Sequence, residues 1–291
     1  MANGLVYFGS GDNNVYALNA TTGAKVWNYT TGGAVDSSPA VAGGVVYIGS
    51  NDNNVYALNA KTGALLWSCN VNGVMFTALA VSQVYGLVYV AVSGNDFSGA
   101  VYALSTSNGT VAWSVNFGGF AIPASPAVVN GKVYTGNFNN GIYALNVITG
   151  TQEWANAATG AIESAPAVAN GIVFVNSTDG HLYEFNAANG GFLRTAVIAN
   201  NLNSSPAVAN GVVYVTSPDS NVYAFDVSSL TNLWQYPTGN SVTASPIVAN
   251  GVLYACSNDG NVYAFELPNA PAAPSRRPDL RTLKPVSAPG R

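Results

Sequence analysis

Acidic residues recur in the turns of this 291-residue chain and are the first candidates for chemistry. Five aspartates stand just after strand-like runs: Asp12, Asp52, Asp179, Asp219 and Asp259. Acidic turns can bind calcium, which takes six to eight oxygen ligands. Each of these turns offers one carboxylate, and no second acid follows two residues later. Asp, Asn and Gly are also the ordinary residues of hairpin turns, so we predict turns here and no metal site.

Histidine and cysteine add little further chemistry. The single histidine, His181, falls in a turn with no second histidine or any cysteine nearby, which disfavours a metal site or a Ser/His/Asp triad. Cys69 and Cys256 lie in different repeats and form no CxxC pattern, which disfavours a disulfide framework. The sequence therefore predicts no catalytic residue, no metal and no cofactor.

The elements that carry these residues repeat along the chain. Segments similar to VYALN begin at Val15, Val55, Val101, Ile142, Leu182, Val222 and Val262. Their spacing is 40 or 41 residues, except for 46 between the second and the third. A period near 40 with several short β-rich runs is typical of propeller blades. No window shows the 3.6-residue periodicity that helical repeats require.

A single repeat shows which strands to expect. Within residues 37–69 we predict four strands, Ser37–Val41, Val45–Gly49, Val55–Asn59 and Leu65–Cys69, separated by turns rich in Asn, Asp and Gly. Pro39 cannot donate to a β-ladder, so it suits the edge of a sheet.

The turn before the fourth strand carries a motif that resembles the mark of the PQQ-like (pyrroloquinoline-quinone-like) propeller repeat, Ala-x-Asp-x-x-Thr-Gly-x-x-x-Trp. The first repeat matches with Ala17, Asn19, Thr22, Gly23 and Trp27, where Asn replaces Asp. Later repeats match fully or in part, the sixth having lost its glycine to Leu230. The resemblance covers residues 1 to about 267. It implies an all-β fold, a seven-bladed β-propeller with incomplete terminal blades.

The resemblance also implies that the motif tryptophans have a structural docking role, each packing between adjacent blades. These are Trp27, Trp67, Trp113, Trp154 and Trp234. Repeat five departs from the motif at two positions together, with Glu184 in place of Ala and Arg194 in place of Trp. Since the two positions lie on adjacent strands, we predict that an ion pair replaces the tryptophan packing there.

Positions that vary among regular repeats are candidates for binding. The residue three before the first-strand proline, or its equivalent, is Asp36, Met75, Pro123, Glu163, Asn203 and Thr243 in successive repeats. Because the innermost strand of a propeller lines the central channel, we place this set at the channel rim, with Asp36, Glu163, Asn203 and Thr243 as binding candidates. The alternative is that these positions form only a solvated channel rim and bind no ligand. Asp36 and Glu163 are three blades apart, too far to act as a paired acid and base.

Repeat three departs most from the pattern, with six extra residues between Val81 and Val101. Longer loops often carry function. Met75, Phe76, Tyr85 and Phe97 are therefore candidates for an apolar contact patch, although ordinary loop drift explains them equally well.

Both ends of the repeat array look incomplete. Alignment of residues 2–7 with residues 169–174 leaves the first repeat without its first strand, and the last repeat lacks a Thr-Gly…Trp fourth strand after Phe265. We expect one domain over residues 1–267 and a disordered Pro/Arg-rich tail over 268–291. The reading frame is hypothesised to begin late relative to its relatives, with any export signal upstream, because no signal peptide is visible.

Composition and charge limit the classes of function. Only 8% of residues are charged, and residues 1–267 contain four basic residues against twelve acidic ones. An acidic body argues against nucleic-acid binding, and no apolar run is long enough to span a membrane. We expect a monomeric, non-catalytic scaffold that presents loops to a protein, peptide or glycan, outside the cell or in the periplasm by resemblance. The alternatives are a quinoprotein-type oxidoreductase, a small-ligand binder at the channel mouth, and a fragment of a larger protein.

Overall fold

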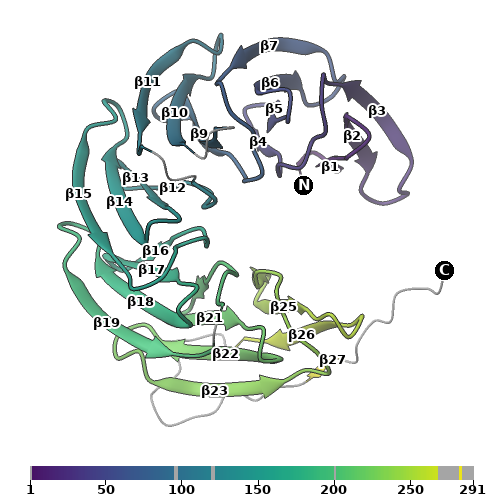
Figure 1. Ribbon diagram of the computed structural model, residues 1–291. Coiled ribbons are helices and arrows are strands. Elements are labelled where there is room, and N and C mark those ends of the chain that lie inside the picture. The colour runs from purple at the N-terminus through teal and green to yellow at the C-terminus, as the bar shows by residue number, and fades with distance from the viewer. Residues whose placement is uncertain (1, 95–97, 119–121, 200, 268–281, 284–291) are drawn as a thin grey trace. The chain divides into compact units, whose positions relative to one another are not determined.

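The computed structural model describes residues 2–94, 98–118, 122–199 and 201–267, and the backbone alone of 282–283. These residues contain no helix and form seven antiparallel sheets, each of three or four strands (Figure 1). Each sheet is one blade, so the fold is the all-β, seven-bladed propeller that the repeats predict. The chain divides into two compact units, Met1–Ala155 and Asn156–Arg291.

Unit 1 contains the first three blades and the fourth up to its last strand. Blade one is β1 (Leu5–Gly9), β2 (Asn14–Asn19) and β3 (Lys25–Thr30). Blade two is β4 (Ala40–Ala42), β5 (Val45–Gly49), β6 (Asn54–Asn59) and β7 (Leu65–Asn70). Blade three is β8 (Ala80–Ser82), β9 (Leu87–Ser93), β10 (Gly99–Ser105) and β11 (Val111–Asn116). Blade four is β12 (Ala127–Val129), β13 (Lys132–Gly136), β14 (Gly141–Asn146) and β15 (Gln152–Ala157).

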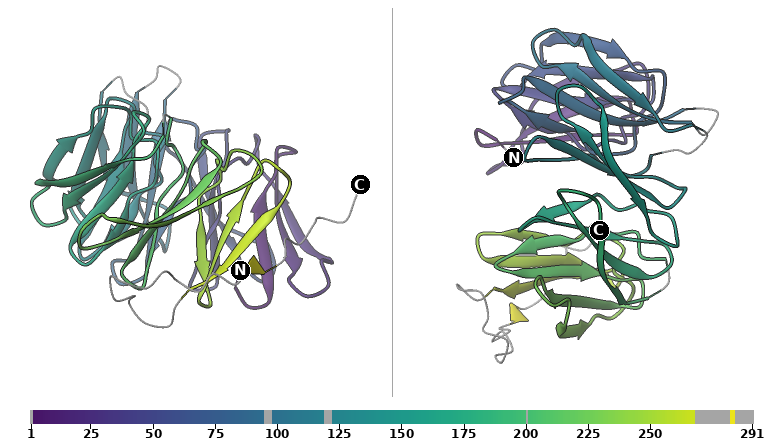
Figure 2. Two further views of the ribbon diagram at one scale, coloured as in Figure 1. Left: turned by 90° about the horizontal axis from the view of Figure 1, so that it is seen from below. Right: turned by 90° about the vertical axis from the view of Figure 1, so that its left-hand side faces the viewer.

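Unit 2 contains the remaining blades. Blade five is β16 (Ala167–Ala169), β17 (Ile172–Asn176), β18 (His181–Asn186) and β19 (Phe192–Val197). Blade six is β20 (Ala207–Ala209), β21 (Val212–Thr216), β22 (Asn221–Asp226) and β23 (Asn232–Pro237). Blade seven is β24 (Ile247–Ala249), β25 (Val252–Cys256), β26 (Val262–Glu266) and β27 (Thr282–Leu283). Within each unit the strands run between two opposite ends where the turns gather (Figure 2).

The predicted strands match the observed ones closely except at the inner edge. In blade two the second strand has the predicted bounds, and the third and fourth differ by one residue. The first strand is shorter than predicted and begins only at Ala40. Its upstream neighbour Ser37 bonds instead to β5, donating to and accepting from the backbone of Gly49 at 2.8 and 2.9 Å.

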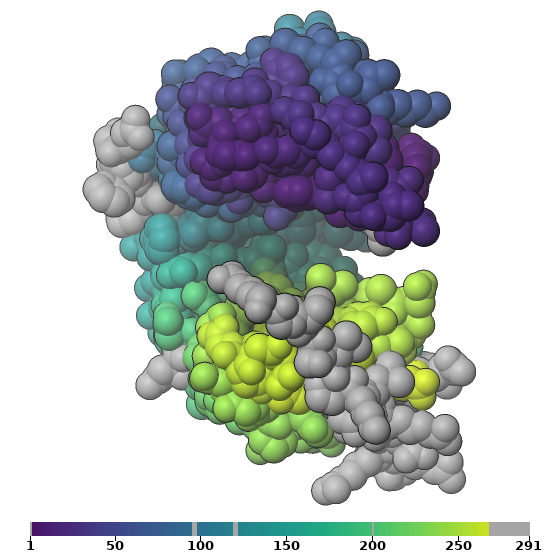
Figure 3. All heavy atoms as spheres, turned by 90° about the vertical axis from the view of Figure 1, so that its right-hand side faces the viewer, coloured from purple at the N-terminus to yellow at the C-terminus, as the bar shows by residue number. Residues whose placement is uncertain are grey.

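The terminal blades confirm one expectation and correct another. Blade one has three strands and lacks an inner strand, as predicted. Part of its surface is visible in purple in Figure 3, and Phe8 on β1 is 38% exposed. Blade seven does have a fourth strand, since Thr282 and Leu283 of the tail pair with Phe265 and Ala264. The remainder of the tail lies outside the described residues.

Blades of unit 1 are joined through the motif tryptophans. Trp27 donates its indole N–H to the carbonyl of Ala60 in the next blade at 3.0 Å, and the hydroxyl of Tyr7 donates to the same oxygen at 3.0 Å. Trp113 and Tyr89 share the carbonyl of Val147 in the same way. A buried indole N–H needs such a partner, so one carbonyl serves both aromatic residues of the preceding blade.

Blade five replaces this arrangement with an ion pair, which confirms the prediction for that repeat. Glu184 and Arg194 are cross-strand partners, and Nη1 of Arg194 lies 3.0 Å from Oε2 of Glu184. The Glu184 side chain is fully buried, whereas that of Arg194 is 44% exposed. Burial raises the pKa of the Glu184 carboxyl, and the nearby guanidinium only partly offsets this.

Candidate functional site

The inner strand of six blades is preceded by a two-residue pattern that defines the candidate site. Five residues before the strand stands an apolar side chain that is at most 2% exposed: Val35, Met75, Ile122, Ile162, Leu202 and Val242. The next residue is turned outward or half-buried, and we call it the rim position. Its occupants are Asp36, Phe76, Pro123, Glu163, Asn203 and Thr243.

The structure corrects the assignment of Met75 in repeat three. The sequence alignment placed Met75 at the rim, but Met75 is fully buried and Phe76 occupies the rim position. The error is a register slip of one residue. Leu79 replaces the proline that marks the other inner strands, and without that marker the alignment of residues 74–79 lost its anchor.

The predicted contact patch does not form as a unit. Met75 is inaccessible, and Phe76 and Tyr85 lie at opposite ends of blade three. Phe76 lies near the end of β9, where Val74 bridges to Ser93, whereas Tyr85 precedes the start of β9. Phe97 lies outside the described residues. Phe76 lines a concave surface.

That concave surface is an apolar pocket between blades three and four. Its volume is about 340 Å³, and it is lined by Val74, Phe76, Thr77, Ala91, Ser93, Gly94, Ile122, Pro123 and Phe138. Ile122, Ala91 and Thr77 form the buried part, with exposures of 1%, 1% and 8%. Phe76 and Phe138 are 60% and 47% exposed. Large exposed aromatic side chains around an apolar hollow mark an interaction site more often than a chance surface.

The extra residues of repeat three build one wall of this pocket. Strands β9 and β10 each have seven residues, whereas β5 and β6 of blade two have five and six. The longer hairpin lets the backbones of Val74 and Ser93 pair, with N···O distances of 2.9 and 3.1 Å. Gly94 at its end also lines the hollow. The insertion thus raises a wall beside the rim of blade three.

The four polar rim candidates are divided between the units, with Asp36 in unit 1 and the other three in unit 2. Asp36 is exposed and accepts a hydrogen bond from the side-chain amide of Asn51 at 2.7 Å. Glu163, in unit 2, is half-buried, and this burial raises its carboxyl pKa. Asn203 and Thr243 are exposed on the following two blades. None of the four lines the pocket.

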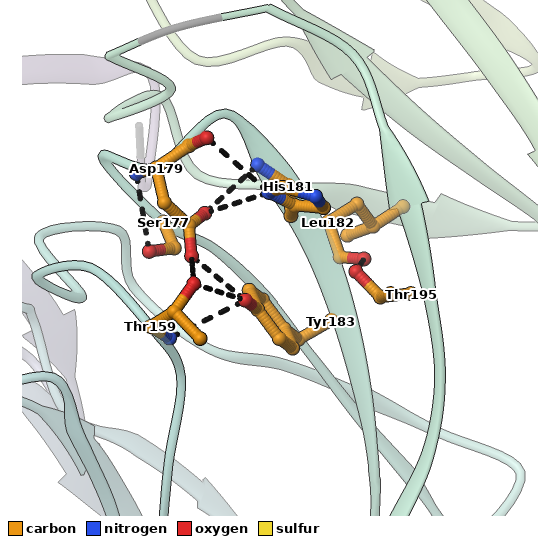
Figure 4. A network of polar contacts seen from close by, with 7 residues as sticks. All are labelled: Thr159, Ser177, Asp179, His181, Leu182, Tyr183 and Thr195. Atoms are coloured by element: carbon orange, nitrogen blue, oxygen red, sulfur yellow. Dashed lines mark hydrogen bonds and ion pairs between the residues drawn. The ribbon is translucent and has the colours of Figure 1, made fainter.

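The aspartate-bearing turns are held together by hydrogen bonds within the protein (Figure 4). The carboxylate of Asp179 accepts bonds from Tyr183 at 2.7 Å, from the backbone N–H of His181 at 3.0 Å and from Thr159. Burial raises the pKa of Asp179, but these donors outweigh it and leave the pKa below its usual value. The same Asp–Tyr bond recurs in four other blades, at Asp12, Asp52, Asp219 and Asp259. These carboxylates therefore stabilise turns.

Charge in unit 1 is sorted between its two ends. The rim end carries Asp36 and the turn aspartates Asp12 and Asp52. The opposite end carries the three lysines that the structure describes in this unit and one acid: Lys25, Lys61, Lys132 and Glu153. A hydrogen bond from Tyr16 is the main reason that the pKa of Asp12 falls to about 2. The pocket therefore opens on an end whose described charges are all negative.

Sequence reasoning missed Phe138 and Ile122. Phe138 stands just after β13, in the turn column where blades two, five and seven have Asn51, Thr178 and Asn258. Blades one and six have Gly11 and Pro218 there, so a large aromatic residue in a column of small or polar residues was a readable signal. Ile122 belongs to the buried column and gave no signal, because its part in the pocket depends on the neighbouring blade.

Metal-ligating side chains are scattered over the part of the chain that the structure describes. Among the described residues, no three His, Cys, Asp or Glu side chains gather where they could hold a metal ion. The two cysteines are free and lie in different units. In the part of the chain that the structure describes, no helix could cross a membrane.

Comparison with solved structures supports the fold. BamB from Moraxella catarrhalis aligns with a TM-score of 0.79 and 19% identity, over 100% of this chain and 87% of that one. The computationally designed Ika8 protein aligns with a TM-score of 0.79 and 15% identity, over 96% and 86%. The quinohemoprotein alcohol dehydrogenase of Comamonas testosteroni gives 0.75 and 14%, over 91% of this chain but 64% of that one.

Sequence comparison identifies the family. No curated protein matches the sequence. The family model described as outer membrane protein assembly factor BamB matches residues 1–195 and again residues 98–271, which together cover most of the chain. The chain therefore belongs to the BamB family of outer membrane protein assembly factors.

Proposed function

We propose that this protein is a non-catalytic binding platform that holds a segment of a protein partner in the pocket between blades three and four. The observation that carries the proposal is the pair of exposed aromatic rings, Phe76 and Phe138, over an apolar hollow of about 340 Å³. Ligand pockets begin at about 300 Å³, so this one suits a large side chain or a short segment better than a whole cofactor.

The lining chemistry favours a protein over a glycan. Only Thr77 and Ser93 bring hydroxyl groups among the nine lining residues, and Thr77 already donates to the carbonyl of Ala91 at 3.4 Å. A sugar needs many hydrogen-bond partners, whereas an aromatic or aliphatic side chain needs only apolar contact. BamB-family membership supports a monomer at the cell surface or in the periplasm that engages other proteins.

The test is selection of random peptides on the full-length protein, followed by titration of the enriched sequences. The proposal expects enriched peptides that bind saturably at micromolar concentration, to protein that light scattering shows to be monomeric. Absence of any enriched family would contradict it. In a parallel assay the protein is incubated with PQQ and calcium, and dye reduction is followed with candidate alcohols. Saturable dye reduction would show that the protein is an oxidoreductase and not a non-catalytic platform.

A further inference from the structure

We infer that the segment bound in this pocket is basic, with a large apolar side chain flanked by Lys or Arg. The inference rests on the proposed function and adds the chemistry of the partner. Two independent features carry it: the apolar pocket itself, and the negative end of unit 1 on which the pocket opens.

The rim positions of blades two, three and four follow one another along the inner strands. Strand β4 lies beside β8, and β8 lies beside β12. The backbone N–H of Ala78 donates to the hydroxyl of Ser125 at 2.9 Å, which ties the start of β8 to the start of β12. Asp36, Phe76 and Pro123 therefore form a short row, with the carboxylate at one side of Phe76 and the pocket at the other. A bound segment that fills the pocket and continues over Phe76 meets Asp36 next.

The Asp36 carboxylate is available for a partner's cation. The ion pairs found among the described residues do not include Asp36, and its described contact is a neutral amide, that of Asn51. All three described lysines of unit 1 are at the other end of the blades, so they do not neutralise it.

The two nearby turn aspartates extend the negative field. Asp52 accepts hydrogen bonds from Tyr56 at 2.6 Å and from the backbone N–H of Gly32 at 2.7 Å. Burial raises the pKa of Asp52, but the hydrogen bonds outweigh that effect and lower it overall. Asp12 has a pKa of about 2. Both are ionised at neutral pH and remain so on binding, which attracts a basic segment and repels an acidic one.

The experiment uses the full-length protein and peptides enriched from a random library. Enriched sequences should combine a Phe, Trp, Leu or Met with adjacent Lys or Arg. Their affinity should fall about two- to fivefold with Asp36→Asn and further with Asp36→Lys, and the Asp36→Asn variant should show a weaker salt dependence. The control is Glu153→Gln, which removes one negative charge from the opposite end of unit 1 and should leave the affinity unchanged. Circular dichroism and the midpoint of urea unfolding establish that each variant is folded.

The outcomes separate this inference from the proposed function. If the enriched peptides lack basic residues, and their affinities do not depend on Asp36 or on salt, the inference of a basic segment is wrong. The proposed binding function would still stand. Peptides that lose as much affinity with Glu153→Gln as with Asp36→Asn would also overturn it, because the effect would then follow net charge alone. Failure to enrich any peptide would contradict the proposed function itself.

Discussion

Gly63 of blade two lies directly against the indole ring of Trp27 in blade one. A Cβ atom added to Gly63 would stand 2.7 Å from Cε3 of Trp27, a distance that real Cβ contacts do not reach. Gly109 and Gly150 stand in the same relation to Trp67 and Trp113. The glycine of the motif thus has a role beyond its positive φ, because it makes room for the tryptophan of the preceding blade.

Replacing Gly63 with alanine should destabilise the protein by about 2–4 kcal/mol, since it combines a positive-φ cost of about 1–2 kcal/mol with steric overlap. The matched control is Gly23→Ala. Gly23 has a φ of +70°, close to the +72° of Gly63, but nothing lies within 4 Å of its added Cβ. Only the positive-φ cost should appear there. Equal shifts in the urea unfolding of the two variants would contradict the packing role.

In blades five and six, the tryptophan and the glycine of this pair are both replaced. Arg194 replaces the tryptophan of blade five, and Leu230 with φ +56° replaces the glycine of blade six. Restoring the repeat pattern in part, with Glu184→Ala and Arg194→Trp together, should lower the unfolding midpoint, because Leu230 stands at the repeat position where Gly63 makes room for the indole of Trp27. Adding Leu230→Gly should recover most of that loss. A triple variant no more stable than the double one would show that Leu230 does not hinder a tryptophan at residue 194.

Removing one partner of the ion pair should be costly. Arg194→Ala leaves the fully buried Glu184 carboxylate without its cation, and its Oε1 atom already has no hydrogen-bond partner among the described residues. Breaking a fully buried pair costs about 3–5 kcal/mol. Since Arg194 is 44% exposed, solvent screening should reduce this to about 1–3 kcal/mol at neutral pH. The loss should shrink as the pH falls and Glu184 is protonated, and a pH-independent loss would contradict the electrostatic explanation.

The turn aspartates predict loss of stability in acid. The fold lowers the carboxyl pKa at four of the turn aspartates, Asp12, Asp52, Asp179 and Asp259, and at Asp226, the last residue of β22, which accepts hydrogen bonds from Ser228 and Ser229. A carboxyl with a lowered folded-state pKa binds fewer protons than in the unfolded chain, so it stabilises the fold fully above the unfolded pKa of 3.8. This contribution is lost as the pH falls through the folded-state pKa, which is about 2 for Asp12. Unfolding free energy should therefore fall steeply between about pH 4 and pH 2.

The Tyr56→Phe variant isolates one such turn, because it removes the hydroxyl that bonds Asp52. The carboxyl pKa of Asp52, followed by NMR titration, should rise, while that of Asp12 should not move. If the pKa of Asp52 stays unchanged in Tyr56→Phe, the hydrogen bond from Tyr56 is not what lowers it.

Most of the fold could be predicted from local sequence patterns. The VYALN period located the blades, and the paired changes at Glu184 and Arg194 predicted a real ion pair, because both partners lie within one hairpin. Prediction failed where it lacked a local marker: Leu79 in place of proline caused the one-residue slip at Met75. The pocket was missed for a different reason, since Phe76 and Phe138 are 62 residues apart and come together only through packing of adjacent blades.

In the proposed function, the pocket between blades three and four, lined by Phe76 and Phe138, holds the partner segment. The most direct measurement compares the affinity of an enriched peptide for two variants, Phe138→Ser and Leu66→Ser. Both remove one exposed apolar side chain from unit 1, at 47% and 51% exposure, but Leu66 lies on the outer strand β7, away from the pocket. We expect a loss of about tenfold or more for Phe138→Ser, the contribution of one buried aromatic ring, and no change for Leu66→Ser. Unchanged binding to Phe138→Ser, or equal losses in both variants, would contradict it.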